Sequence, residues 1–221
     1  LSRSFEGTIQ GSGATGSDEL VGGATLKFGH KSLVFSVGGS RRDSDDYAIP
    51  GFANIDGDEV EDETEEHHKI ADGHLPNSFT ETTRGAMGLS FIGQDRYLGI
   101  SWSGLDKTYG LPGGHLEAHD EENEEDGVEG LTPHEEEGDV AINLEQRRFD
   151  LEGSWNLAGT LVNRVKARVG VSDYTHRERE GEKTGTVFDN KQWEMRLEAE
   201  HRPASRVRGT FGFQIGGREF S

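Results

Sequence analysis

The chain has 221 residues, of which 32 are glycine and 31% are hydrophobic, with a mean hydropathy of −0.75 and a formal net charge of −19. So little apolar material leaves a soluble β-sandwich of this length short of core. The negative charge argues against a nucleic-acid partner, because phosphate binding needs clustered Lys and Arg. The absence of cysteine excludes a disulfide scaffold and a Cys-based metal site. The sequence has no run of about eighteen apolar residues, so it predicts no membrane helix.

Alternating apolar and polar residues predict about nine β-strands, each close to the ~10 residues that a tilted membrane strand needs. In one of them Val165, Ala167 and Val169 fall on one face, and three cations alternate with them on the other. Such a wet, charged face suits a barrel with a polar interior better than a packed core. The predicted strands are Arg3–Gly11, Glu19–Phe28, Leu33–Arg42, Phe79–Ile92, Tyr97–Tyr109, Asp139–Trp155, Thr160–His176, Gly185–His201 and a last strand from Arg206.

The connections between these strands alternate between short and long. Short turns near residues 30, 94, 158 and 203 would lie at one end, and the connections 43–78 and 110–138 at the other. Outer-membrane barrels have short periplasmic turns and longer extracellular loops. The pattern therefore predicts an all-β fold, an antiparallel up-and-down transmembrane β-barrel segment. The competing architectures are a β-sandwich and a soluble β-solenoid.

Three local expectations follow from the same pattern. Trp155, Trp193 and Tyr97 are expected near the short-turn end, where an aromatic girdle would sit. The strand 139–155 changes parity, because Val140, Ile142 and Leu144 alternate out of phase with its lower half; we interpret this as a β-bulge or as a half that stands clear of the membrane. The ladder of Arg164, Lys166 and Arg168 pairs with carboxylates of a plug domain or forms the wetted wall of a lumen.

The two long connections are acidic and carry histidines. Zinc takes imidazole nitrogen and carboxylate oxygen, usually from four ligands, and imidazole favours zinc, copper, nickel or iron over calcium. Calcium is the alternative ion for the carboxylates of residues 56–59, and plain solvation of acidic loops is the alternative to any metal. His176, Glu178 and Glu180 form a weaker cluster, interpreted as a polar rim. The predicted metal ligands are His67, His68 and His74 in the first connection and His115, Glu117, His119 and His134 in the second.

Three stretches carry a family resemblance: Tyr109–His119, Val171–Glu178 and Gly185–Asn190. In this order and spacing they resemble the barrel of TonB-dependent outer-membrane receptors of the zinc-uptake type. His115 departs from the family pattern, displaced by the extra Gly114. The resemblance implies a bacterial outer-membrane receptor that takes up a divalent metal ion or a metal chelate. Zinc would be the transported ligand, with no catalytic cofactor, and the partners would be outer-membrane lipid, a plug domain and the energy-coupling TonB protein.

Such transporters have barrels of about 22 strands. Residues 1–221 are therefore predicted to be part of one barrel domain, a fragment without the plug and the remaining strands. An outer-membrane enzyme is one alternative; it needs a nucleophile or an Asp/His pair held on rigid strands, and the sequence has no G-x-S-x-G motif. A passive porin or an adhesion surface with solvated acidic loops is the other. We predict a receptor and not an enzyme.

Overall fold

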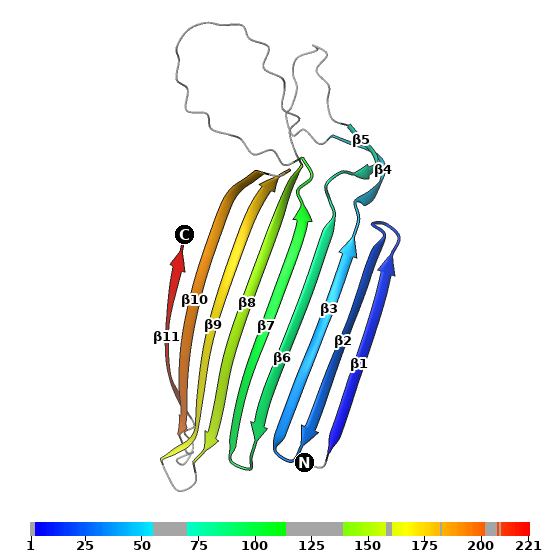
Figure 1. Ribbon diagram of the computed structural model, residues 1–221. Helices are drawn as coiled ribbons and strands as arrows, with labels where there is room; N and C mark the ends of the chain where they lie inside the picture. The colour runs from blue at the N-terminus through cyan, green and yellow to red at the C-terminus, as the bar shows by residue number, and fades with distance from the viewer. Residues whose placement is uncertain are drawn as a thin grey trace, which may run out of the picture.

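A computed structural model describes residues 3–54, 70–113, 139–157, 161–181, 183–201, 207 and 209–221. The regular structure of these residues is entirely β-sheet (Figure 1). None of the described segments is a helix long and apolar enough to cross a membrane. The strands are β1 (Ser4–Ala14), β2 (Glu19–His30), β3 (Leu33–Ser44), β4 (Tyr47–Asn54), β5 (Ile70–Leu75), β6 (Thr80–Ile92), β7 (Arg96–Gly110), β8 (Val140–Asn156), β9 (Val162–Glu180), β10 (Lys183–His201) and β11 (Thr210–Phe220).

Nine of these strands form one antiparallel sheet in the order β1-β2-β3-β6-β7-β8-β9-β10-β11. Each strand pairs with the next along the chain, except that the β4–β5 hairpin intervenes between β3 and β6. The predicted fold class is confirmed, as a nine-stranded up-and-down sheet that is open, with β1 and β11 as its edges. The hairpin is new, because the sequence predicted only a loop over residues 43–78.

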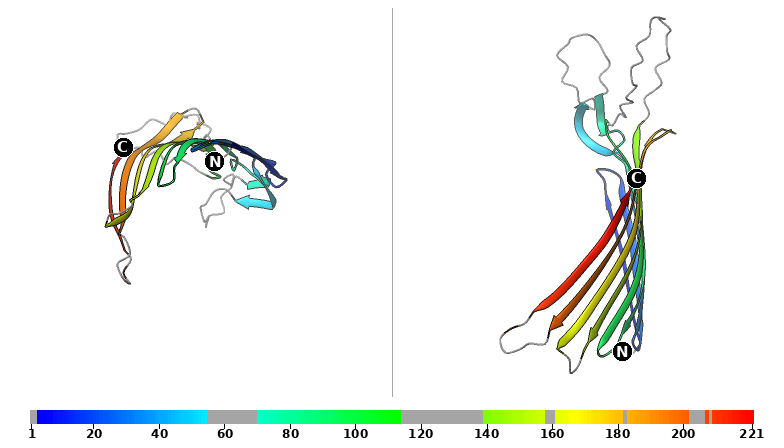
Figure 2. Two further views of the ribbon diagram at one scale, coloured as in Figure 1. Left: turned by 90° about the horizontal axis from the view of Figure 1, so that it is seen from below. Right: turned by 90° about the vertical axis from the view of Figure 1, so that its left-hand side faces the viewer.

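The sheet is curved like a trough (Figure 2, left). Its polar face lines a hollow that reaches from Thr8 on β1 to Gln146 on β8 and takes in six adjacent strands. A hollow that six neighbouring strands share must lie on the inside of the curve. The polar face is therefore concave, and the apolar face is convex.

The apolar residues of the convex face stand in register across the whole sheet. A single row of paired residues runs from β1 to β11 and is apolar at every position. Its members are Phe5, Phe28, Phe35, Leu89, Ile100, Leu151, Val169, Met195 and Ile215. The next row toward the long-loop end continues the band with Leu26, Val37, Met87, Trp102, Phe149, Val171 and Trp193.

Of the two interpretations of the parity change in β8, the β-bulge is wrong. This strand pairs without a register shift with both β7 and β9 from one end to the other. Val140 and Ile142 therefore lie on the concave face, and they are the only buried hydrophobic residues in the described part of the chain, each 2% exposed. Their parity differs because they belong to a small buried patch at the long-loop end and not to the convex band.

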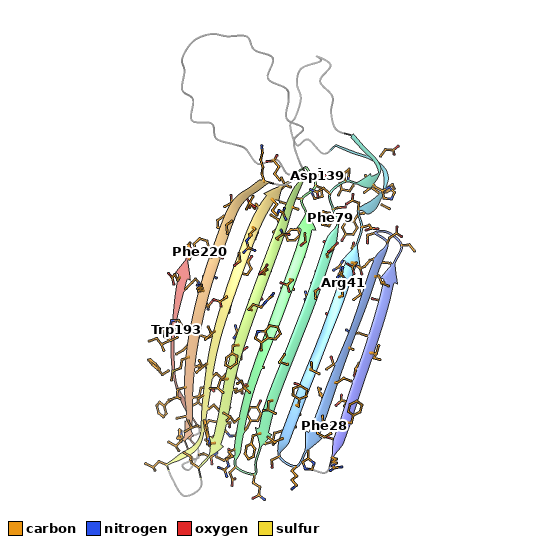
Figure 3. All side chains as sticks on the ribbon, in the orientation of Figure 1. Phe28, Arg41, Phe79, Asp139, Trp193 and Phe220 are labelled. Carbon is orange, nitrogen blue, oxygen red and sulfur yellow. The ribbon has the colours of Figure 1, made fainter. Side chains whose placement is uncertain are left out.

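The predicted girdle of three aromatic residues is also wrong. Tyr97 pairs with Ser154 on the concave face, where its hydroxyl lies over Gly99. Trp193 lies midway along β10 (Figure 3). Only Trp155 is both near the short-turn end and on the convex face, where Phe28 is also found.

Candidate functional site

The concave face of β8, β9 and β10 carries a belt of paired charges. Arg148 Nη2 lies 2.7 Å from an Asp150 carboxylate oxygen and 3.2 Å from one of Glu194. Arg168 Nη2 lies 3.2 Å from Glu152 on the neighbouring strand. These side chains are well exposed, so each pair contributes little to stability, but together they leave this wall close to neutral.

Carboxylates on the neighbouring strands pair with the cationic ladder of Arg164, Lys166 and Arg168. Lys166 Nζ is 2.8 Å and Arg164 Nη1 is 3.9 Å from the carboxylate of Glu200 on β10. The third member, Arg168, pairs with Glu152 on β8. The ladder is neutralised by carboxylates of its own sheet, so its charges are paired without carboxylates from another domain.

The long-loop end holds what we call the loop-root cluster: Asp46, Asn77, Ser78, Leu111 and Val140. The Asp46 carboxylate accepts hydrogen bonds from the backbone N–H groups of Ser78 (2.7 Å) and Asn77 (3.2 Å). The Asn77 amide then donates to the carbonyls of Val140 (2.7 Å) and Leu111 (3.0 Å). Asn77 closes the first long connection, and Leu111 and Val140 flank the second. One buried amide therefore ties the bases of both connections together.

Glycine at position 110 makes this junction possible. A Cβ built there would overlap the side-chain and backbone oxygens of Asn77. Asn77 itself adopts a left-handed backbone with φ of 57°, which Asn tolerates better than most residues. Sequence reasoning missed this cluster, because its hydrogen-bonded partners are more than thirty residues apart in the chain and show no local pattern.

All but one of the sequence-predicted metal ligands lie outside the described residues. His74 is on β5, exposed and paired with Ala48. Among the described residues, no group of three His, Cys, Asp or Glu side chains is close enough to hold a metal ion. His67, His68, His115, Glu117, His119 and His134 fall outside the described residues.

The weaker cluster on β9 is a pair in the described part of the structure. His176 Nε2 lies 3.8 Å from Glu178, and its Nδ1 is 3.3 Å from the Tyr174 hydroxyl. The His176 ring also meets the edge of Phe188, with ring centroids 5.7 Å apart. This arrangement is a polar and aromatic rim on the concave wall, and the described residues around it do not supply the third ligand that a zinc site needs.

No model of a known protein family matches this chain.

Proposed function

We propose that this chain forms part of the wall of a β-barrel in the bacterial outer membrane. The supporting observation is the convex apolar band, whose central residues such as Leu89 and Ile100 are 46% and 41% exposed. Soluble proteins rarely leave a continuous apolar surface of such extent uncovered. Lipid would cover the convex face, and the polar concave face would line a water-filled lumen.

We further propose that the barrel belongs to a TonB-dependent receptor that takes up a metal ion, with zinc the favoured ion, or a metal chelate. The acidic, histidine-bearing connections 43–78 and 110–138 would capture the cation at the extracellular mouth. The loop-root cluster supports this proposal, since Asn77 joins the bases of both connections. Two histidine-bearing arms that start from one junction can contribute ligands to one ion.

The membrane proposal is tested by two neighbours on β7 that face opposite ways. Ile100→Arg would place a cation in lipid and should destabilise the folded chain by about 2–4 kcal/mol. Ser101→Arg places the same side chain on the concave wall near Asp150, its cross-strand partner, and should cost less than about 1 kcal/mol. Urea unfolding in lipid vesicles measures both. Equal costs, or a larger cost for Ser101→Arg, would contradict a lipid-facing convex side.

Metal capture is tested by replacing His115 and His119 together with Ala. We expect zinc affinity to fall at least tenfold, which corresponds to about 1.4 kcal/mol, while calcium binding stays nearly unchanged. The control is His176→Ala, which removes an imidazole from the wall and should leave zinc affinity intact. Titration calorimetry on the detergent-solubilised protein gives both constants. Unchanged zinc affinity in the double variant would reduce the second connection to a solvated surface.

The affinity should also depend on pH. Zinc binds neutral imidazole and ionised carboxylate, so protons compete with the metal. We expect zinc affinity to fall as the pH drops through about 6.5, the ordinary range of histidine. The measurement compares zinc affinity at pH 7.5 and at pH 5.5, about one unit above and one unit below that value. An unchanged affinity would exclude histidine as a ligand.

A further inference from the structure

The hollow on the concave face of β1–β3 and β6–β8 has a lining unlike the rest of this chain. It has a volume of about 670 Å³, within the range of small-molecule sites. The whole protein has 42 acidic and 23 basic residues, yet none of the described residues around the hollow is Asp or Glu. Its two charged residues are the cations Lys27 and Arg84.

Hydroxyl and amide groups make up the rest of the polar lining. The hydroxyls belong to Thr8, Thr25, Ser36, Ser40, Ser101 and Ser103, and the amides to Gln10 and Gln146. None of these side chains has a hydrogen-bond partner within the described part of the chain. They are donors and acceptors left open to whatever fills the hollow.

Glycines on the floor of the hollow keep it wide. A Cβ at Gly38 would lie 3.0 Å from the Thr25 hydroxyl, and one at Gly88 would lie 3.1 Å from the Ser36 hydroxyl. A Cβ at Gly23 would lie 3.1 Å from the Cβ of Ser40. Short polar side chains therefore extend over neighbouring glycines, where larger residues would fill the space.

Arg84 is the unpaired charge of this wall. It stands between Ser40 and Leu105 in the sheet, and it has no ion-pair or hydrogen-bond partner among the described residues. The concave cations of β8 and β9, in contrast, all pair with carboxylates. Lys27 has only a distant partner, Glu6, whose carboxylate is 4.0 Å away.

We propose that this hollow binds the oxyanion group, carboxylate or phosphate, of a small polar solute. A guanidinium presents donors in a planar fork that matches two oxygens of such a group, and Arg84 is free to do so. The surrounding hydroxyls and amides would hydrogen-bond the rest of the solute, and no acidic lining residue would repel it. The site is independent of metal capture by the long connections.

The test is titration calorimetry on the folded, detergent-solubilised chain at low ionic strength. The probes are citrate for a carboxylate, inorganic phosphate for a phosphate, and glucose as an uncharged polyol. We expect at least one anion to bind more tightly than glucose. Arg84→Gln should weaken that binding at least tenfold, and Arg84→Lys, which keeps the charge but loses the fork, should weaken it less. Which of the two anions binds more tightly identifies the oxyanion.

Two further variants test whether binding depends on the charge inside the hollow. Arg41→Gln removes a cation from the convex face of β3, where Arg41 pairs with Asp43, and should leave anion binding unchanged. Ser103→Asp adds a carboxylate to the hollow while keeping Arg84, and it should weaken binding at least tenfold. The proposal fails if the unmodified chain binds neither anion, as it would were the hollow filled by a protein segment. It also fails if glucose binds as tightly as the anions, or if both Arg84→Gln and Ser103→Asp retain full binding.

Discussion

Asn77 and Gly110 show how two residues set the geometry of the loop end. The Asn77 amide reaches the carbonyls of Leu111 and Val140, at the two ends of the second connection, only because Gly110 leaves room for it. The junction is buried, with Asn77 8% exposed. A change at either residue therefore disturbs both long connections at once.

Gly110→Ala should destabilise the folded chain by about 1–3 kcal/mol, because the new methyl group overlaps Asn77 in a packed junction. Gly22→Ala is the matched control, since Gly22 is also a strand glycine and a Cβ there meets nothing within 4 Å. Urea unfolding in detergent should show a lower midpoint for Gly110→Ala only. A similar loss in both variants would mean that the cost comes from glycine replacement in strands and not from the junction.

At the scale of elements, the β4–β5 hairpin is held by its base. Backbone hydrogen bonds join Asp45 to Ser17 and Ala48 to Gly16 in the β1–β2 turn, and the Asp46 carboxylate holds the returning chain at Asn77 and Ser78. The sequence did not predict these strands, because Tyr47–Asn54 and Ile70–Leu75 are short, and Pro50 and two glycines interrupt their pattern.

Asp46→Ala should release the hairpin from the sheet without unfolding the sheet. Two buried backbone N–H groups would lose their acceptor, at a cost of about 1–3 kcal/mol each. Hydrogen exchange should therefore become faster at Asn77 and Ser78, while β7 and β8 stay protected. The neighbouring substitution Asp45→Ala is the control, because no side-chain partner of Asp45 is found among the described residues. Unchanged exchange in Asp46→Ala would show that backbone bonds alone hold the hairpin.

At the scale of the molecule, the direction of the edge strands limits how the sheet can be completed. In an antiparallel sheet of nine strands the first and the last run the same way, as β1 and β11 do (Figure 1). They cannot pair with each other as antiparallel neighbours. An all-antiparallel barrel built around this sheet would need an odd number of further strands, and a second copy inserted in the same orientation could not supply them.

We therefore expect the isolated chain to aggregate in water or to require detergent. Its two edges present unpaired backbone groups, and its convex face presents the apolar band. Size-exclusion chromatography with light scattering, with and without detergent, measures the state. A monodisperse monomer in detergent-free buffer would contradict both the open edges and the lipid-facing surface.

The nine strands of the sheet, their order and the face on which most residues lie could all be predicted from the amino-acid pattern. Those properties are local: a period of two assigns the faces, and short turns between consecutive strands fix their pairing. The same parity puts Tyr97 on the face away from Leu98 and Ile100, so the girdle prediction neglected the face of Tyr97, and it also misplaced Trp193, which lies midway along its strand. Of the predicted metal ligands, only His74 lies within the described residues.

Features that depend on the register between distant segments could be found only in the folded sheet. The burial of Val140 and Ile142, the pairing of the cationic ladder with Glu152 and Glu200, and the isolation of Arg84 all belong to this group. An alternating pattern gives a residue its face but not its neighbours across the sheet. Contacts between residues tens of positions apart arise when the strands align, and those contacts determine which charges are paired, which residues are buried and where a hollow remains.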